Sequence, residues 1–139
     1  MAGSGPLLDR MKELVSDLDI TDKVIFCGQV KDVDLLYAKA GIYVLPSLLE
    51  GFPNSLCEAM AAGLPVICYD SIPWEEILED GVSGMVVKGI EDTKLTKALQ
   101  KLICDEGLRR KLGSDAVSIR ERLNIENIGK QVEEFIFSK

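Results

Sequence analysis

The sequence predicts an α/β domain built on a doubly wound parallel sheet. Its 139 residues suffice for one domain with a buried core. Apolar residues make up 47% of the chain and charged residues 28%, as in a soluble globular protein. Four short apolar runs are continuous rather than alternating, which favours parallel strands covered on both faces. Stretches of helical character separate these runs, which lie at 23–28, 42–46, 65–70 and 84–88.

The first expected element is an amphipathic helix over residues 7–18, preceded by the turn Gly3-Ser4-Gly5-Pro6. A glycine-rich turn into a helix is where a parallel sheet presents backbone N–H groups to an anion. Almost no strand precedes this turn. Two interpretations stay open: the chain is cut just inside a larger fold, or residues 1–5 derive from cloning.

Further helices are expected between and after the strands. Residues 33–41 and 54–63 connect the first three strands. In the last third, apolar residues at positions i, i+3, i+4, i+7 and i+8 predict an amphipathic helix; they are Leu95, Ala98, Leu99, Leu102 and Ile103. Two more helices are expected over 107–123 and 124–137, the second with Asn124 as its N-cap. We therefore expect one partial domain over residues 1–139, with C-terminal helices from about 92 to 139.

Composition excludes several classes of function. The net charge of −7 argues against nucleic acid or an anionic membrane as the main partner. No apolar run approaches the roughly 20 residues of a membrane span, and no signal peptide is visible. The chain has no histidine, which removes Ser/His and Cys/His pairs and the usual zinc sites. The four cysteines are widely spaced and are expected to be buried, reduced thiols of a cytosolic protein: Cys27, Cys57, Cys68 and Cys104.

Two glutamates, Glu50 and Glu58, flank a turn at the carboxyl end of the predicted strand 42–46. Open α/β sheets bind ligands at this end. Asn54 or Ser55 can cap the helix that follows. Local spacing leaves alternatives open, because Ser55-x-x-Glu58 fits a capping box, in which the Glu58 carboxylate bonds back to the Ser55 N–H. Glu50 taken alone reads as an exposed loop acid.

The segment 46–67, PSLLEGFPNSLCEAMAAGLPVI, resembles the signature of retaining GT-B glycosyltransferases of the family-4 type, group 1. Upstream, GSGP, KVIFCG and LLYAKAGIYVLPS resemble the same family, and so does SIPWEEILEDGVSGMVV downstream. The similarity runs from Gly3 to about Val87. It implies the C-terminal, Rossmann-like half of a GT-B fold, the domain that binds a nucleotide-sugar donor, here without its first strand.

The resemblance also implies a role for each matched residue. Glu50 would lie beside the donor sugar and help to position the reacting centre, as the catalytic residue of the set. Glu58 would accept hydrogen bonds from the ribose diol. The loop between them would contact the sugar and diphosphate through main-chain N–H groups; its matched residues are Gly51, Phe52, Asn54 and Ser55. Pro53 replaces the commoner glycine and donates no N–H.

The remaining matches lie outside this loop. Gly28, Gln29 and Val30 would hold the nucleotide base, largely through backbone groups, while Gly3 and Gly5 match the turn near the phosphates. Glu76 matches an acid of looser structural role, and taken alone it is more simply interpreted as an exposed or capping residue.

The implied reaction transfers a glycosyl unit from a nucleotide-diphosphate sugar, with a UDP-sugar as the favoured donor, and retains the anomeric configuration. No cofactor and no metal are implied. Two Asp-x-Asp triplets occur, at 17–19 and 32–34, and such triplets hold metal in other glycosyltransferases. Here one ends a predicted helix and the other opens one, so we interpret them as caps or solvated acids.

The family's Arg and Lys for the diphosphate, and its N-terminal acceptor domain, are not matched by this chain. We therefore expect a fragment that is inactive alone. Its parent would act in the cytoplasm or at the cytoplasmic face of the membrane, in polysaccharide or glycoconjugate synthesis. The strands 23–28 and 42–46 would keep unpaired edges, which either pair with each other or are closed by dimerisation or strand exchange.

Two other classes stay in view. One is a non-catalytic nucleotide-binding or assembly module on the same fold. The other is an unrelated doubly wound domain such as a signalling receiver, which needs an acidic cluster and a switch lysine that this sequence does not place.

Overall fold

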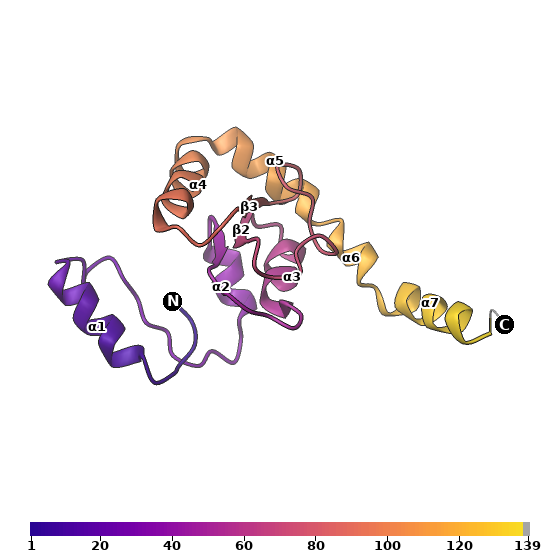
Figure 1. Cartoon of the computed structure of the whole chain (residues 1–139), viewed down its shortest axis with the longest axis horizontal. Coiled ribbons are helices and arrows are strands. Elements are labelled where there is room, and N and C mark those ends of the chain that lie inside the picture. The colour runs from indigo at the N-terminus through magenta and orange to yellow at the C-terminus, as the bar shows by residue number, and fades with distance from the viewer. Residues whose placement is uncertain (138–139) are drawn as a thin grey trace. The chain divides into compact units, whose positions relative to one another are not determined.

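The computed structural model describes residues 1–137, and they form two compact units. The first unit is Met1–Leu36 and the second is Tyr37–Lys139. Each is described by itself below. Figure 1 labels the helices and the strands β2 and β3.

The first unit contains the expected helix, α1 (Leu8–Asp17), whose Val15 side chain is buried. The predicted strand at 23–28 is wrong, because Lys23 ends a turn and residues 24–28 form neither strand nor helix. Three bonds join it to the first residues of the chain: the Met1 amino group donates to the Ile25 carbonyl at 2.5 Å, the Cys27 N–H to the Met1 carbonyl at 2.8 Å, and the Gly3 N–H to the Gly28 carbonyl at 2.7 Å. These bonds do not extend into the continuous ladder that a strand needs.

The second unit is built on three parallel strands in the order β1-β2-β3: β1 (Tyr43–Leu45), β2 (Val66–Tyr69) and β3 (Met85–Val87). Val44 lies opposite Ile67, and Cys68 opposite Val86. All four residues of β2 are buried, as expected of the central strand of a parallel sheet. The predicted α/β fold with a parallel sheet is confirmed.

Helices cover the strands. α2 (Asp34–Lys39) crosses the boundary between the units, and α3 (Asn54–Ala61) connects β1 to β2. α4 (Asp92–Cys104) and α5 (Glu106–Ala116) follow β3. In Figure 1 the strands lie between α3, which packs against β1 and β2, and α4, which packs against β3.

The single helix predicted over 107–123 is two helices, since α5 ends at Ala116 and α6 (Ile119–Arg122) begins after a break. At the break the Ser118 hydroxyl donates to the Asp115 carbonyl at 2.8 Å, a local bond that competes with helix continuation. The last helix, α7 (Ile125–Phe137), begins as predicted, with the Asn124 side chain accepting the Glu126 N–H at 2.8 Å.

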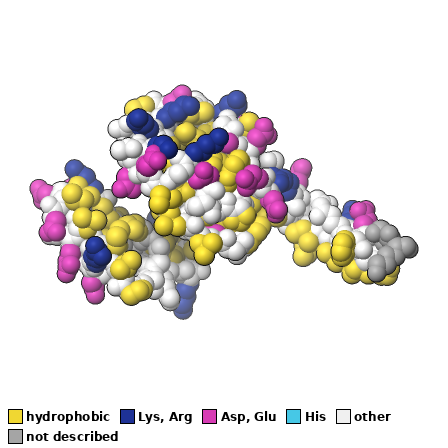
Figure 2. Space-filling model, viewed as in Figure 1, with side chains coloured by type: hydrophobic (Ala, Val, Ile, Leu, Met, Phe, Trp, Pro, Cys, Tyr) yellow, Lys and Arg dark blue, Asp and Glu magenta, His cyan; other side chains and the backbone are white. Residues whose placement is uncertain are grey.

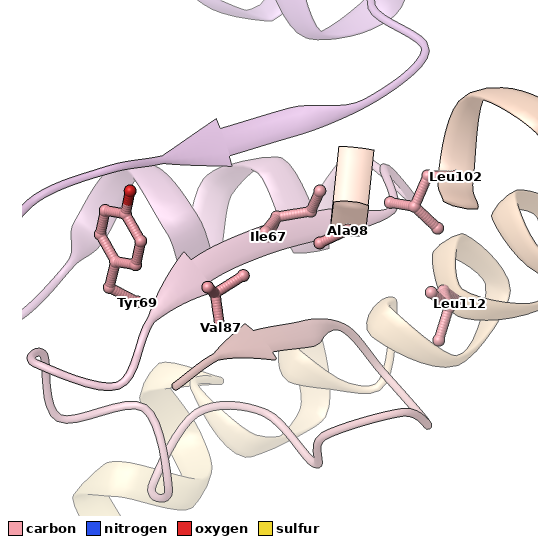
Figure 3. Close-up of a cluster of buried hydrophobic side chains, with 6 residues drawn as sticks. All are labelled: Ile67, Tyr69, Val87, Ala98, Leu102 and Leu112. Carbon is pink, nitrogen blue, oxygen red and sulfur yellow. The ribbon is translucent and has the colours of Figure 1, made fainter. Parts of the chain in front are cut away.

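The core of the second unit joins the sheet to α4 and α5. Figure 3 shows its six side chains: Ile67, Tyr69, Val87, Ala98, Leu102 and Leu112. Leu95 and Leu99 pack against this cluster, as the helical period predicts. Ile103 departs from the prediction and is 62% exposed. The alternate residues of β2, Val66 and Cys68, point to the other face, which α3 covers.

Two glycines allow α5 to pass close to the turn after α3. A Cβ added at Gly113 would lie 2.3 Å from the carbonyl oxygen of Gly63. Gly63 itself has φ +81°, a left-handed conformation that favours glycine. Gly113 is therefore required by the close approach of the two backbones, and Gly63 by its own left-handed conformation.

The expectation of four buried cysteines is only half right. Cys57 and Cys68 are buried, whereas Cys27 and Cys104 are exposed, and all four are free thiols. Within residues 1–137, none of the helices combines the length and apolar character that crossing a bilayer takes. Figure 2 shows apolar side chains along one side of α7, which buries none of its residues.

Candidate functional site

The Glu50–Glu58 segment lies where β1 ends and α3 begins. Its loop follows the carboxyl end of β1, the edge at which open parallel sheets bind ligands. Glu50 is half-buried in this loop, and Glu58 is exposed on α3. Gly51, Phe52 and Asn54 lie on the surface, but the Asn54 N–H, one of the predicted donors, already donates to the Phe52 carbonyl at 3.0 Å.

The start of α3 is set by Pro53 and not by a side-chain cap. The predicted capping by Asn54 or Ser55 is wrong, since Pro53 is the N-cap residue and no side chain caps the helix. The Pro53 ring is fully buried, and its carbonyl accepts the N–H groups of Leu56 at 3.0 Å and Cys57 at 3.2 Å. The missing N–H of proline costs nothing at this position, because the first amides of a helix lack intrahelical acceptors.

Glu58 is held by a tyrosine from another helix. The Tyr37 hydroxyl donates to Glu58 Oε2 at 3.0 Å and also lies 3.3 Å from the Ser55 carbonyl oxygen. The capping box that local spacing allowed is absent from residues 1–137, where no bond joins the Glu58 carboxylate to the Ser55 N–H. The Glu58 carboxylate is therefore not used to cap its own helix.

Tyr43 of β1 bonds to the first turn of α3. Its hydroxyl donates to Ser55 Oγ at 2.8 Å, and its ring meets the Tyr37 ring edge-on, with centroids 6.0 Å apart. Burial raises the pKa of Tyr43 above its ordinary value of about 10; the hydrogen bond with Ser55 opposes this, and the charges of Glu58 and Glu50 add to it. Both carboxylates therefore act electrostatically on one phenol.

Sequence reasoning missed Tyr37 and Tyr43. A signal for them exists, because each is a tyrosine within an apolar segment, and a buried tyrosine hydroxyl needs a hydrogen-bond partner. The identity of that partner is a tertiary fact, since Tyr37 and Glu58 are separated by 21 positions.

The other predicted site residues belong to the first unit. Gly3 and Gly28 are brought together by the hydrogen bond between their backbones, and both have positive φ, +118° and +62°. The Gly5 carbonyl accepts the Leu8 N–H at 3.1 Å where α1 begins. Gln29 is exposed and Val30 is half-buried. Their roles toward a base or phosphate stay predictions about this unit.

A groove of about 920 Å³ lies elsewhere in the second unit. Its lining includes Trp74, Leu78 and Ser83, which precede β3, together with Ser114 of α5 and Arg122 of α6. It therefore sits at the amino ends of β2 and β3, opposite the edge that carries Glu50.

The Arg122 guanidinium is anchored beside this groove on backbone oxygens. It donates to the Ile77 carbonyl at 3.0 Å and to the Glu76 carbonyl. Glu76 thus contributes its backbone here, and its side chain is exposed. Over residues 1–137 no group of three or more His, Cys, Asp or Glu side chains is placed to hold a metal ion; Asp17 ends α1 and Asp34 opens α2.

Comparison with known proteins agrees with this architecture. The family described as "Glycosyl transferases group 1" matches residues 1–118. An exopolysaccharide phosphotransferase of Streptomyces coelicolor is 34% identical over 95% of this chain and 14% of its own length. A lipopolysaccharide core biosynthesis mannosyltransferase, LpcC of Rhizobium leguminosarum, is 32% identical over 78% of this chain and 31% of its own length.

Among solved structures, HepE of Anabaena in complex with UDP is 26% identical, with a TM-score of 0.87 over 99% of this chain and 40% of HepE. The chain thus spans well under half of each of these relatives. Since the family match covers most of the chain and includes the Glu50–Glu58 segment, the chain belongs to the group 1 glycosyltransferases.

Proposed function

We propose that this chain is the nucleotide-sugar binding part of a retaining glycosyltransferase. The parent enzyme transfers a sugar from a nucleotide-diphosphate donor, with a UDP-sugar as the favoured one, to an acceptor in polysaccharide or glycoconjugate synthesis. Glu58 binds the ribose diol and Glu50 lies beside the donor sugar. The loop residues between them contact the sugar and diphosphate.

One observation carries this proposal. The Glu58 carboxylate sits at the carboxyl edge of the sheet and is oriented by Tyr37, while its own helix makes no use of it. A carboxylate has about four lone-pair sites, so the single bond from Tyr37 leaves acceptors for two vicinal hydroxyl groups. HepE, a relative that covers nearly all of this chain, is solved with UDP, and that supports a uridine nucleotide as the ligand class.

The reaction breaks the bond between the anomeric carbon and the diphosphate oxygen. A bond to the acceptor hydroxyl oxygen forms on the same face, and the acceptor proton passes to the leaving diphosphate. Negative charge grows on that diphosphate, and in this proposal the positive end of the α3 helix dipole stabilises it. Glu50 orients the sugar during this step.

Other parts of the parent protein complete the enzyme in this proposal. The chain spans 14% to 36% of the length of its curated relatives, which leaves room for an acceptor-binding domain. Without that domain, the chain binds a donor and does not transfer its sugar. The parent would act in the cytoplasm, at the membrane face where its acceptor is lipid-linked.

The test is a calorimetric titration of the chain with UDP, GDP, ADP and the corresponding sugar nucleotides. We expect UDP to bind, and Glu58→Gln to weaken it about tenfold or more, because a hydrogen bond to a charged group contributes about 1.5–3 kcal/mol. Glu50→Gln should weaken the UDP-sugar but not UDP.

Glu133→Gln is the matched control, since it makes the same charge change on exposed α7. If no nucleotide binds, or if Glu58→Gln binds as well as the native chain, the proposal is wrong. Turnover by the isolated chain with any acceptor would refute the requirement for a second domain. A full-length protein that binds the donor but never transfers it would instead be a nucleotide-binding module.

A further inference from the structure

The carboxylate of Glu58 is oriented from outside its own helix. An exposed glutamate on a helix ordinarily samples several rotamers, because nothing fixes its terminal torsion. Here the Tyr37 hydroxyl of α2 donates to Oε2 at 3.0 Å. One oxygen of the carboxylate is thereby tied, and Oε1 keeps its full accepting capacity.

Tyr37 is itself held in place. Its side chain is buried, with 9% exposure, and its ring packs edge-on against Tyr43 of β1 at 6.0 Å between centroids. Tyr43 is in turn bonded to Ser55 Oγ on the first turn of α3. Three elements therefore fix the phenol relative to the helix that carries Glu58.

We propose that Tyr37 is a positioning residue, which sets the Glu58 carboxylate in the orientation that accepts both hydroxyls of a ribose. This inference rests on the proposed function of Glu58. A vicinal diol needs two acceptor directions at a fixed angle, and a carboxylate that is already fixed loses no rotamer freedom when it binds. Tyr37 contributes to discrimination between ribose and sugars without the diol.

Comparing two ligands tests this inference: UDP and 2′,3′-dideoxy-UDP, which lacks the diol. The native chain should prefer UDP. Tyr37→Phe keeps the ring and removes the hydroxyl, so UDP affinity should fall about three- to tenfold, the effect of one hydrogen bond, while affinity for the dideoxy analogue should stay unchanged. Tyr69→Phe, which removes a hydroxyl from another buried tyrosine, is the matched control and should leave the ratio unaltered.

A double-mutant cycle separates positioning from a general effect on the fold. In the Glu58→Gln background, Tyr37→Phe should cause less loss of UDP affinity than in the native chain, because its target carboxylate is gone. Equal losses in the two backgrounds would overturn the inference, as would equal losses for both ligands. If UDP binds the native chain and Tyr37→Phe changes nothing, the inference alone fails; if the native chain binds no nucleotide, the proposed function fails with it.

Discussion

At the scale of single residues, the phenol of Tyr43 is the most informative group in the candidate site. It is desolvated by burial, bonded to Ser55 and flanked by the charges of Glu58 and Glu50. Burial and the two negative charges all disfavour the tyrosinate. The titration of Tyr43 therefore reports on the charge of its acidic neighbours.

We predict that Glu58→Gln lowers the pKa of Tyr43, because it removes one of the charges that raise it. The measurement is an absorbance titration of tyrosinate, with Tyr43→Phe used to assign the transition. Because the pKa of Tyr43 is raised in the folded state, its protonated phenol contributes to the free energy of unfolding. This contribution is complete below about pH 10 and is lost as the pH rises through the pKa of the folded state. In Tyr43→Phe, the free energy of unfolding should therefore fall less at alkaline pH than in the native chain. An unchanged titration of Tyr43 in Glu58→Gln would contradict the prediction.

The cysteines give a second prediction at this scale. Burial raises the pKa of Cys68 to about 12, and it also raises the pKa of Cys57. Because the thiolate is the reactive form, labelling with a disulfide reagent at about pH 8 should modify Cys27 and Cys104 quickly and the other two only on unfolding. Peptide mapping after a short labelling time reads this out, and early modification of Cys68 would be inconsistent with its burial in β2.

The site was predictable from the sequence only in part. Glu50 and Glu58 could be proposed from the sequence because their loop carries a recognisable signature within one stretch of chain. Tyr37 and Tyr43 could not be proposed in this way, because their hydrogen-bond partners are determined only by the tertiary structure. Capping by Asn54 or Ser55 was expected from residue preference, but the buried Pro53 ring fixes the helix start and Tyr43 engages the Ser55 hydroxyl.

At the scale of elements, the crossing of α5 over the turn after α3 tolerates no side chain. Gly113→Ala would bring a Cβ to 2.3 Å from the Gly63 carbonyl oxygen, a backbone atom that cannot swing aside. We expect this change to lower the free energy of unfolding by about 1–3 kcal/mol, the usual cost of overpacking. Thermal or urea denaturation measures the loss.

Gly107→Ala is the matched control in the same helix. Its Cβ would meet only the Asp105 carboxylate at 3.4 Å, an ordinary contact. Since alanine is the better helix former by about 1 kcal/mol, this variant should be neutral or slightly more stable. Equal effects of the two changes would show that helix propensity, and not the crossing, governs position 113.

Which elements could be predicted follows from what stabilises them. The runs 42–46, 65–70 and 84–88 became strands because each finds a parallel neighbour in the chain. The run 23–28 has the same apolar character but pairs only with Met1 and Gly3 through isolated bonds. Composition signals that a segment is suited to a sheet, whereas the partner decides whether the strand forms.

At the scale of the whole molecule, the sheet of the second unit ends at β1. Over residues 1–137 its order is β1-β2-β3, so β1 is bonded along one edge only. Unpaired strand edges are templates for another chain. The exposed apolar residues of α7, among them Ile125 and Phe135, add surface that water solvates poorly.

We predict that the chain self-associates as its concentration rises. Light scattering coupled to size-exclusion chromatography should give a mass above that of one 15.3 kDa chain at high concentration. The sequence predicts the fold, but it does not decide whether the exposed strand edges pair within one chain or are covered by dimerisation. If the mass stays that of a monomer at every accessible concentration, neither the edge of β1 nor the apolar side of α7 mediates contacts between copies.

The groove beside Arg122 contains the single tryptophan, Trp74, far along the chain from the Glu50 loop and at the opposite edge of the sheet. Its fluorescence is therefore a spectroscopic label supplied by the native sequence. Emission under selective tryptophan excitation should follow unfolding of the segment that leads into β3. Donor binding at the carboxyl edge should leave that emission almost unchanged, so a nucleotide titration needs heat or tyrosine absorbance as its signal.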